Sequence, residues 1–285
     1  MKSKFFIIKI LISLLLLTGN VFAKSLPPGS GIGDVPANVL ILLDKSGSMG
    51  ARMTSGAGVY YPESTAIDSS GNVYAGQYYT YGIKKFDYST SAVDTSWGSS
   101  GIYRGSGSCR SYYPRAMKVH NGYLYVAATY NYRIFRINLS TGKCDWNKYH
   151  YYAHSLDIQN NILYSNGYNS LLVRNLSTNT DISCSYSGNL RNYSRWAYSV
   201  AVDSSGSNFY GYNYRYLYRF AIGSNKCPST SYSSRIYKSN WYYSFGMRFH
   251  PSNDNIFYAT NYYGHKLQKI TLNAAKTRYD SLSSV

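Results

Sequence analysis

One strand pattern recurs five times between Pro62 and Leu272, and this repeat decides the fold class. Each copy holds an apolar strand, a polar turn that often carries Gly, an aromatic strand, a second turn, and a strand with alternating basic residues. The equivalent apolar positions are 52, 39, 44 and 47 residues apart, at Ile67, Val119, Ile158, Val202 and Phe249. A period of about 40–50 residues made of several short strands is typical of β-propeller blades. We therefore predict an all-β fold with about five blades over residues 56–271.

The repeats depend on one another, because a single unit has too little apolar area to fold alone. The first copy, Pro62–Ala75, has the sequence PESTAIDSSGNVYA and resembles the NHL family of propeller repeats. The resemblance implies four-stranded sheets that pack face to face around a central axis. Five such units are enough to form a ring.

Ahead of the repeats, an apolar run of strand length, Val39–Leu43, leads into a turn that contains Asp44, Ser46 and Ser48. This D-x-S-x-S turn resembles the metal-ion-dependent adhesion site of von Willebrand factor A-type domains. The resemblance implies that the carboxylate and the two hydroxyls are ligands of Mg²⁺, which takes oxygen ligands in octahedral geometry. They make an incomplete site, so we predict weak or no Mg²⁺ binding by this chain and restored binding when the A-type domain is completed.

The end of the chain predicts a helix over residues 272–285, because Leu272, Ala275, Tyr279 and Leu282 fall at helical spacing. In A-type domains the adhesion motif leads shortly into such a helix. We therefore interpret residues 24–55 and 272–285 as the start of an α/β A-type domain into which the propeller is inserted. The loops that complete the family's cation site do not follow, so the chain is either a fragment of a longer protein, which we favour, or carries a vestigial A-type domain.

The first 23 residues have the features of a secretory signal peptide: a basic start, the apolar run Ile10–Leu17 and a small residue, Ala23, at the expected cleavage point. We predict export to the periplasm, the cell surface or the medium, and no transmembrane span after cleavage. Losing three lysines with the signal lowers the formal net charge from +17 to +14. This excess favours anionic partners, among them nucleic acid and acidic polysaccharide.

Four cysteines lie in the exported part, at Cys109, Cys144, Cys184 and Cys227. In an oxidising compartment their even number predicts two disulfides. Three pairings are open, and the sequence does not choose among them. No close cysteine pair of the zinc-binding kind occurs in the sequence.

Tyrosine is unusually frequent, with 35 residues, and many stand in pairs such as Tyr112-Tyr113 and Tyr151-Tyr152 within expected loops. Amphipathic rings suit stacking on sugars or on protein surfaces. Arg133, Arg215 and Arg235 are candidates for cation–π contacts beside them. The alternative is that tyrosine serves as a strand former that packs the blades.

We interpret the chain as an exported adhesion or binding protein, not an enzyme, whose partner is a protein or glycan at a cell surface. An A-type segment beside a propeller also resembles the tip-associated adhesin and biogenesis proteins of type IV pili, which implies pilus subunits as partners. One alternative is a propeller hydrolase or lyase, although the five histidines, including His150 and His154, form no recognised metal or triad motif. A second alternative is single-stranded DNA binding in an uptake system.

Overall fold

The computed structural model describes residue 59 and residues 62–284, except residues 79, 195–196, 214–215, 238–245, 251–252 and 262–265. All of them belong to one compact unit, Val39–Val285. The signal segment 1–23, the segment 24–55 and the residues Asp44, Ser46 and Ser48 lie outside the described part of the chain. Nothing below tests the predictions made for them.

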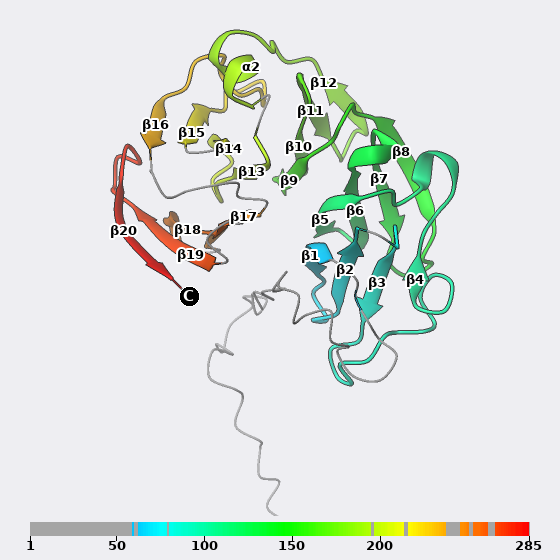
Figure 1. Cartoon of the computed structure of the whole chain (residues 1–285). Coiled ribbons are helices and arrows are strands. Elements are labelled where there is room, and N and C mark those ends of the chain that lie inside the picture. The colour runs from blue at the N-terminus through cyan, green and yellow to red at the C-terminus, as the bar shows by residue number, and fades with distance from the viewer. Residues whose placement is uncertain are drawn as a thin grey trace, which may run out of the picture. The chain divides into compact units, whose positions relative to one another are not determined.

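Five antiparallel sheets of four strands each follow one another around a central axis (Figure 1). We number them as blades 1 to 5 in chain order. Blade 1 contains β1 (Pro62–Ile67), β2 (Val73–Gln77), β3 (Ile83–Phe86) and β4 (Ile102–Tyr103). Blade 2 contains β5 (Pro114–His120), β6 (Tyr123–Ala128), β7 (Arg133–Asn138) and β8 (Cys144–Tyr149). Blade 3 contains β9 (Ser155–Gln159), β10 (Ile162–Gly167), β11 (Ser170–Asn175) and β12 (Thr180–Ile182).

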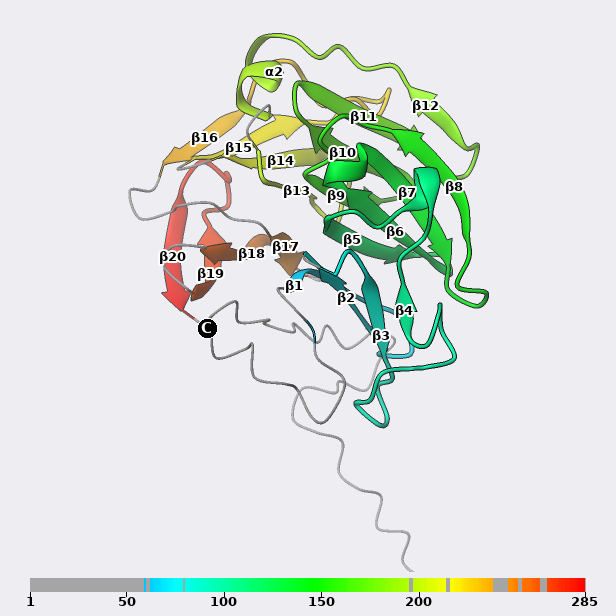
Figure 2. The same ribbon diagram turned by 45° about the vertical axis from the view of Figure 1, so that its right-hand side comes forward.

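The two remaining blades repeat the same order. Blade 4 contains β13 (Ser199–Val202), β14 (Asn208–Asn213), β15 (Tyr216–Ala221) and β16 (Ser234–Tyr237). Blade 5 contains β17 (Met247–His250), β18 (Asn253–Asn261), β19 (Lys266–Leu272) and β20 (Tyr279–Ser284). The first strand of each blade lies nearest the axis, as Figure 2 shows for β1, β5 and β9. The predicted five-bladed β-propeller is confirmed.

The second strand of a blade is apolar on both faces because it lies between two neighbouring blades. In β6, Leu124 and Val126 pack in the core shared with blade 1, whereas Tyr125 and Ala127 pack in the core shared with blade 3. Successive side chains of a strand point to opposite faces of the sheet. A strand buried on both faces therefore needs a continuous apolar run, which this part of the repeat supplies.

Each pair of consecutive blades from 1 to 5 shares an apolar core. Four such clusters occur among the described residues, one for each pair. Aromatic side chains fill much of their volume, and Phe135, Phe209 and Phe257 are fully buried. Large rings suit this position because the inner faces of two twisted sheets must be bridged with few side chains.

Charged side chains link the inner strands across the axis. Asp157 of β9 is buried, and it accepts a hydrogen bond of 2.9 Å from Lys118 Nζ of β5. Arg248 of β17 lies 3.9 Å from the same carboxylate and donates to the Met117 carbonyl oxygen at 3.3 Å. Burial alone would raise the pKa of Asp157, but Lys118 and Arg248 together with a backbone hydrogen bond hold this pKa below its usual value. Blades 2, 3 and 5 thus meet at one ionic cluster.

Two disulfides select one of the three open pairings. Cys109 in the link between blades 1 and 2 is bonded to Cys144 of β8, 35 residues later. Cys184, which follows β12, is bonded to Cys227 in the loop before β16, so this bridge joins blades 3 and 4. Closing a loop of this length stabilises a fold by about 4 kcal/mol in the chain-entropy view. The pairing also indicates an oxidising environment for the folded chain.

The predicted helix over residues 272–285 is wrong. Residues 279–284 form β20, the outer strand of blade 5, with Ile270 and Leu282 in register. Asn273 is the physical reason, because its Oδ1 accepts hydrogen bonds from the backbone N–H groups of Thr277 and Arg278 and so closes a turn. The outer strand of the last blade therefore comes from the C-terminal segment itself.

Helices are few and short in the described part of the chain. They are the 3₁₀ turns η2 (Gly107–Cys109) and η3 (Thr129–Asn131) and the helix α2 (Gly188–Ser194). Among the described residues, no helix has the length and the apolar character that crossing a membrane requires.

Candidate binding face

The propeller has two ends with different chemistry. The loop between the second and third strands of a blade and the link that enters that blade lie at the same end, where backbone hydrogen bonds join them. Thr129 N–H donates to the Tyr113 carbonyl oxygen at 3.0 Å in blade 2, and Tyr168 N–H donates to the Tyr151 carbonyl oxygen at 3.0 Å in blade 3. The turns after the first and third strands lie at the opposite end, which we call the turn face. We call the first end the tyrosine face, after Tyr78, Tyr81, Tyr112, Tyr113, Tyr130, Tyr132, Tyr151, Tyr152, Tyr168 and Tyr198.

The rings over blades 1 and 2 touch one another. The ring centroids of Tyr81 and Tyr112 are 4.2 Å apart, and those of Tyr78 and Tyr113 are 4.4 Å apart. Tyr130, which is exposed, joins the two pairs because its ring lies 4.8 Å from that of Tyr113 and 5.9 Å from that of Tyr112. Tilted contacts at these separations are the preferred geometry of aromatic pairs.

The contacts continue over blade 3. Tyr132 lies 5.1 Å from Tyr151 and 4.9 Å from Tyr152, measured between ring centroids. Tyr168, in the loop between β10 and β11, lies 6.2 Å from Tyr151. Tyr130 connects this group to the first, because its centroid is 6.3 Å from that of Tyr152. The tyrosine face is therefore one contiguous aromatic surface that covers the loops of blades 1, 2 and 3.

Four of these tyrosines have a left-handed backbone. The φ angles are +50° at Tyr81, +61° at Tyr113, +53° at Tyr132 and +46° at Tyr152. A bulky residue in this region is uncommon, because its Cβ crowds the neighbouring carbonyl oxygen at a cost of about 1–2 kcal/mol. Such strain persists only where the surroundings enforce it, and it concentrates at functional sites. The loops of this face thus hold four tyrosines in an uncommon backbone conformation.

Hydroxyl groups add polar links within the same surface. Tyr132 and Tyr152 share a hydrogen bond, which raises the pKa of Tyr132 to about 12. A hydrogen bond with Tyr112 likewise raises the pKa of Tyr81. Burial raises the pKa of Tyr130, and this hydroxyl also bonds with Tyr78. The rings are therefore neutral at ordinary pH and already ordered, so a partner need not order them on binding.

A buried polar layer supports the tyrosines from below. Arg115 of β5 is 7% exposed, and its guanidinium lies 5.7 Å from the ring centroid of Tyr113 and 5.1 Å from that of Tyr198. Its Nη1 is 3.0 Å from His154 Nδ1, which must act as the acceptor. Burial lowers the pKa of His154 to about 3, with Arg115 adding to the effect, and burial lowers the pKa of His150 to about 4. Both imidazoles are neutral at ordinary pH.

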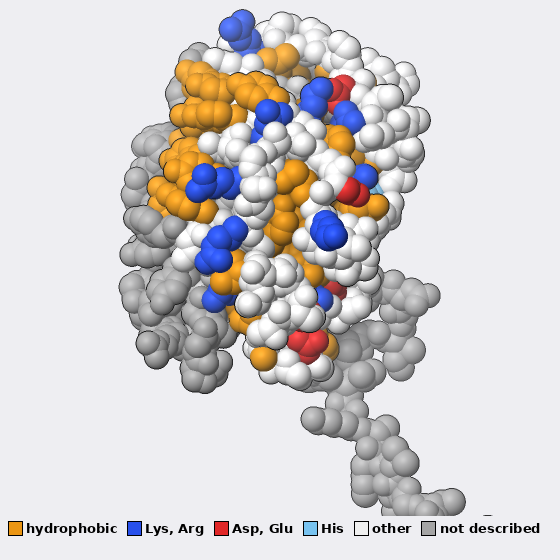
Figure 3. Space-filling model, turned by 90° about the vertical axis from the view of Figure 1, so that its right-hand side faces the viewer, with side chains coloured by type: hydrophobic (Ala, Val, Ile, Leu, Met, Phe, Trp, Pro, Cys, Tyr) orange, Lys and Arg blue, Asp and Glu red, His pale blue; other side chains and the backbone are white. Residues whose placement is uncertain are grey.

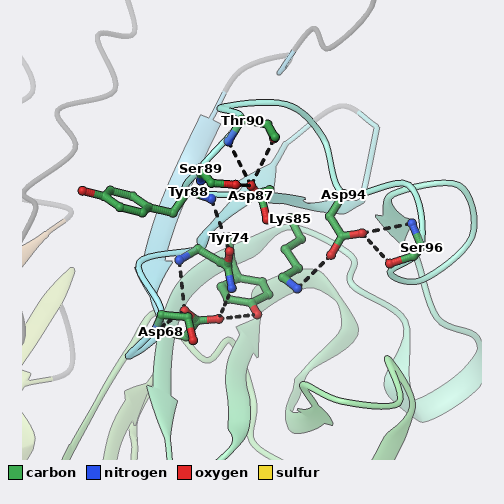
Figure 4. Close-up of polar contacts among 11 residues, drawn as sticks. Asp68, Tyr74, Lys85, Asp87, Tyr88, Ser89, Thr90, Asp94 and Ser96 are labelled. Atoms are coloured by element: carbon green, nitrogen blue, oxygen red, sulfur yellow. Dashed lines mark hydrogen bonds and ion pairs between the residues drawn. The ribbon is translucent and has the colours of Figure 1, made fainter. Parts of the chain in front are cut away.

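On the turn face, carboxylates close turns of the chain. Asp68 follows β1 and accepts hydrogen bonds from the backbone N–H groups of Ser70 at 2.9 Å and Asn72 at 3.0 Å. Its second oxygen accepts from the Tyr74 hydroxyl at 3.0 Å (Figure 4). Asp203 is in the same place in blade 4, where it accepts from Ser207 N–H at 2.9 Å. These acids are occupied by the turns that they stabilise.

A second set of turns on this face shares a short motif. Asp87, Asn138 and Asn175 lie at the end of the third strand of their blades. They begin the sequences Asp-Tyr-Ser-Thr, Asn-Leu-Ser-Thr and Asn-Leu-Ser-Thr. The side-chain Oδ1 of each accepts hydrogen bonds from the next two serine and threonine N–H groups, as Figure 4 shows for Asp87. This repeat was readable in the sequence, and our sequence analysis missed it.

In blade 1, a base of β3 pairs with an acid of the loop that leads to β4. Lys85 Nζ lies 2.8 Å from Asp94 Oδ2, and the hydrogen bond with Lys85 holds the pKa of Asp94 below its usual value (Figure 4). Among the residues that the structure describes, no group of three His, Cys, Asp or Glu side chains is placed to hold a metal ion.

Basic side chains are spread over the blade edges. Figure 3 shows Lys and Arg scattered among hydrophobic and neutral side chains, with a few acids between them. Several arginines lie over aromatic rings, as expected: Arg133 is 5.5 Å from the ring centroid of Tyr149, and Arg235 is 5.0 Å from that of Tyr216. Arg215 lies outside the described residues. Arg110 is exposed and lies 5.2 Å from the ring centroid of Tyr112, so it brings a positive charge to the tyrosine face.

Comparison with known proteins gives the fold and no closer relationship. No protein-family model matches this sequence, and no curated protein matches it. By structure, the chain is similar to the WD40 β-propeller domain of Doa1, with a TM-score of 0.57, 7% identity, and coverage of 79% of this chain and 69% of that one. It is also similar to the computationally designed Ika8 protein, with a TM-score of 0.52, 10% identity, and coverage of 78% and 61%. In all, 782 chains match, so the likeness defines a common fold and not an activity.

A third similarity corrects one of our expectations. Kuenenia stuttgartiensis hydrazine synthase matches with a TM-score of 0.53 and 12% identity over 75% of this chain. The chain spans 56% of the length of that protein. We expected that the chain is not an enzyme, and this expectation was wrong. An enzyme contains a region of the same fold, so the fold does not exclude catalysis. At this identity the likeness concerns the fold alone.

Proposed function

We propose that the protein is an exported binding protein that holds an acidic polysaccharide across its tyrosine face. The observation that carries the proposal is the row of touching rings over blades 1 to 3, four of which are held on a left-handed backbone. A propeller fits such a role because its loops gather at one end of a rigid scaffold.

The ring geometry favours an extended ligand. Tyrosine faces stack on the apolar faces of sugar rings, and their hydroxyls bond to sugar hydroxyls. A surface that covers several blades offers room for consecutive sugar units, so affinity should rise with chain length. Arg110 at its edge and the formal net charge of +14 that remains without the three lysines of the signal segment (17 − 3) favour carboxylate-bearing sugars over neutral ones.

The test uses the disulfide-bonded protein with three probes of similar length: a polyuronate, a neutral β-glucan and single-stranded DNA. We expect calorimetry to give the highest affinity for the polyuronate, with a modest dependence on salt. Replacing Tyr132 and Tyr152 by Ala should remove this binding. Tyr88→Ala is the matched control, because Tyr88 is 62% exposed but follows β3 on the turn face. Equal loss in both variants, or preference for DNA with a steep salt dependence, would overturn the proposal.

A finer form of the proposal concerns adhesion at a cell surface with pilus subunits as partners and with Mg²⁺ held by Asp44, Ser46 and Ser48. It is supported only by the D-x-S-x-S sequence, since these residues lie outside the described part of the chain. Calorimetry with Mg²⁺ on this chain and on one extended to complete the A-type domain tests it. Tight binding by this chain, or unchanged binding in an extended Asp44→Ala variant, would contradict it.

A further inference from the structure

Among the described residues, Tyr81 and Tyr112 form the closest ring pair of the tyrosine face. Their centroids are 4.2 Å apart and their planes are inclined by 54°. At this separation the ring edges are in van der Waals contact. Tyr81 belongs to the loop between β2 and β3, and Tyr112 belongs to the link from blade 1 to blade 2, so the pair spans two segments that are far apart along the chain.

The surroundings of this pair favour one-electron oxidation. Both side chains are partly exposed, so a small oxidant reaches them. Because both side chains reach solvent, water accepts the phenolic proton when an electron leaves the ring. The two disulfides place the folded chain in an oxidising compartment, where such oxidants occur.

We propose that Tyr81 and Tyr112 are a modification site at which peroxide and a haem peroxidase join the two rings by a carbon–carbon bond. Each phenol loses one electron and one proton to give a neutral phenoxyl radical. The radicals couple between the carbon atoms ortho to the hydroxyls, and both rings regain aromaticity when the ortho hydrogens move to the oxygens. The protein loses two hydrogen atoms in total, and one peroxide molecule is reduced to two water molecules.

Geometry favours this pair over the others on the same face. Tyr78 and Tyr113 are almost as close, at 4.4 Å, but burial is the main reason for the raised pKa of Tyr113, so its hydroxyl is shielded from oxidants. Tyr151 and Tyr152 are neighbours in sequence, and their rings are nearly perpendicular at 83°. Among the described ring pairs of this face, Tyr81 and Tyr112 have the shortest centroid separation, 4.2 Å, and both of their side chains are partly exposed.

The product would tie blade 1 to the link that Cys109 already fastens to blade 2. A disulfide is opened by reducing agents, whereas a carbon–carbon bond between two rings is not. The modification would therefore keep the first two blades connected under reducing conditions. This inference does not depend on the identity of the ligand or on the proposed function.

The experiment treats dilute, disulfide-bonded protein with hydrogen peroxide and a haem peroxidase. We expect a monomer with dityrosine fluorescence, an intact mass lower by two hydrogen atoms, and a cross-linked peptide pair that contains Tyr81 and Tyr112. Tyr81→Phe and Tyr112→Phe should each abolish this peptide pair, because Phe keeps the ring and its packing but has no phenol to oxidise. Tyr88→Phe, on the turn face, should leave the yield unchanged.

Two results would overturn the proposal. One is a monomeric product of the parent protein, without substitutions, in which the cross-link joins two tyrosines other than Tyr81 and Tyr112. The other is a peptide pair that persists in the Tyr81→Phe protein. Circular dichroism of both Phe variants, expected to match the parent protein, separates loss of the reactive group from loss of the fold.

Discussion

The two ends of this propeller use the same scaffold in opposite ways. On the turn face, Asp and Asn side chains bond to the backbone of their own turns, as Asp68 and Asp87 do. On the tyrosine face, aromatic side chains from different blades bond and pack with one another, as Tyr130 does with Tyr113 and Tyr152. Many polar groups on the first face close their own turns, with a few contacts to the next blade such as that of Asp203 with Lys276, whereas the second face is built from contacts between aromatic rings of different loops.

This difference between the two faces implies that, within each repeat, some residues stabilise the fold and others bind the partner. Carboxylates that satisfy a turn stabilise the blade in which they lie, and removing one leaves several N–H groups without a partner. Rings on a strained backbone contribute less to folding, because part of their packing energy offsets the strain. We therefore expect substitutions on the turn face to change unfolding and substitutions on the tyrosine face to change binding.

Asp203→Ala should have the largest effect. Asp203 is fully buried and accepts hydrogen bonds from Ser207 N–H, Asn208 N–H and Asn208 Nδ2, while Lys276 of the last turn lies 3.4 Å away. Removing a buried partner of this kind costs about 3–5 kcal/mol. Urea unfolding would measure it. A loss below about 1 kcal/mol, the range expected for the exposed Asp87→Ala, would remove the distinction between the buried and exposed turns.

Acid should weaken the layer beneath the tyrosine face. The pKa values of His150 and His154 are lowered to about 4 and about 3, so the unfolded chain binds protons that the folded chain does not. Stability from these groups is therefore complete above the unfolded pKa and falls as the pH drops below about 6.5, by roughly 2 kcal/mol for each histidine near pH 5. Unfolding free energies measured at several pH values test this, and His154→Gln should reduce the slope. A flat profile between about pH 6.5 and pH 5 would show that neither imidazole is buried as described.

Tyr132→Ala should weaken polyuronate binding by about 1 to 2 kcal/mol, or roughly tenfold in Kd, because the ring belongs to the contact surface. Its effect on the free energy of unfolding should be smaller. The substitution removes ring contacts with Tyr151 and Tyr152 but leaves the apolar cores between the blades unchanged. Calorimetric titration gives the first quantity and urea unfolding gives the second. A variant that unfolds more easily but binds normally would reverse the roles of the two faces.

Asn138→Ala and Asn175→Ala should have the smallest effects. Each removes hydrogen bonds in an exposed turn, so each should cost less than about 1 kcal/mol, and the two should add because the turns are in different blades. Polyuronate affinity should be the same as in the parent protein. Altered affinity in either variant would mean that the turn face takes part in binding.

Much of the fold was readable in the sequence because its repeat carries the physical cause of the propeller. The positions Ile67, Val119 and Ile158, with their later equivalents, all fall in first strands. The last blade was misread because helical spacing in a short segment also occurs by chance. There the turn chemistry of Asn273 and pairing with β19 outweighed the apolar spacing.

The candidate site was only partly predictable. Paired tyrosines indicated aromatic loops, but contact between Tyr81 and Tyr112 depends on the packing of successive blades, which local sequence does not encode. The left-handed backbone at Tyr132 was also hidden, because such angles are expected at Gly or Asn and not at a bulky ring. The disulfide pairing was not predictable either, because the positions of the four cysteines in the sequence are compatible with all three pairings. Only the distances between the cysteines in the folded chain select one.

The disulfides pair the cysteines in their order along the chain, first with second and third with fourth. A polypeptide that enters an oxidising compartment from its N-terminus presents its thiols in that same order. Cys144 therefore meets Cys109 before Cys184 arrives, and Cys227 then finds one remaining partner. In a chain that is translocated from its N-terminus, this order of pairing lets the native set form without reshuffling of wrongly paired bonds.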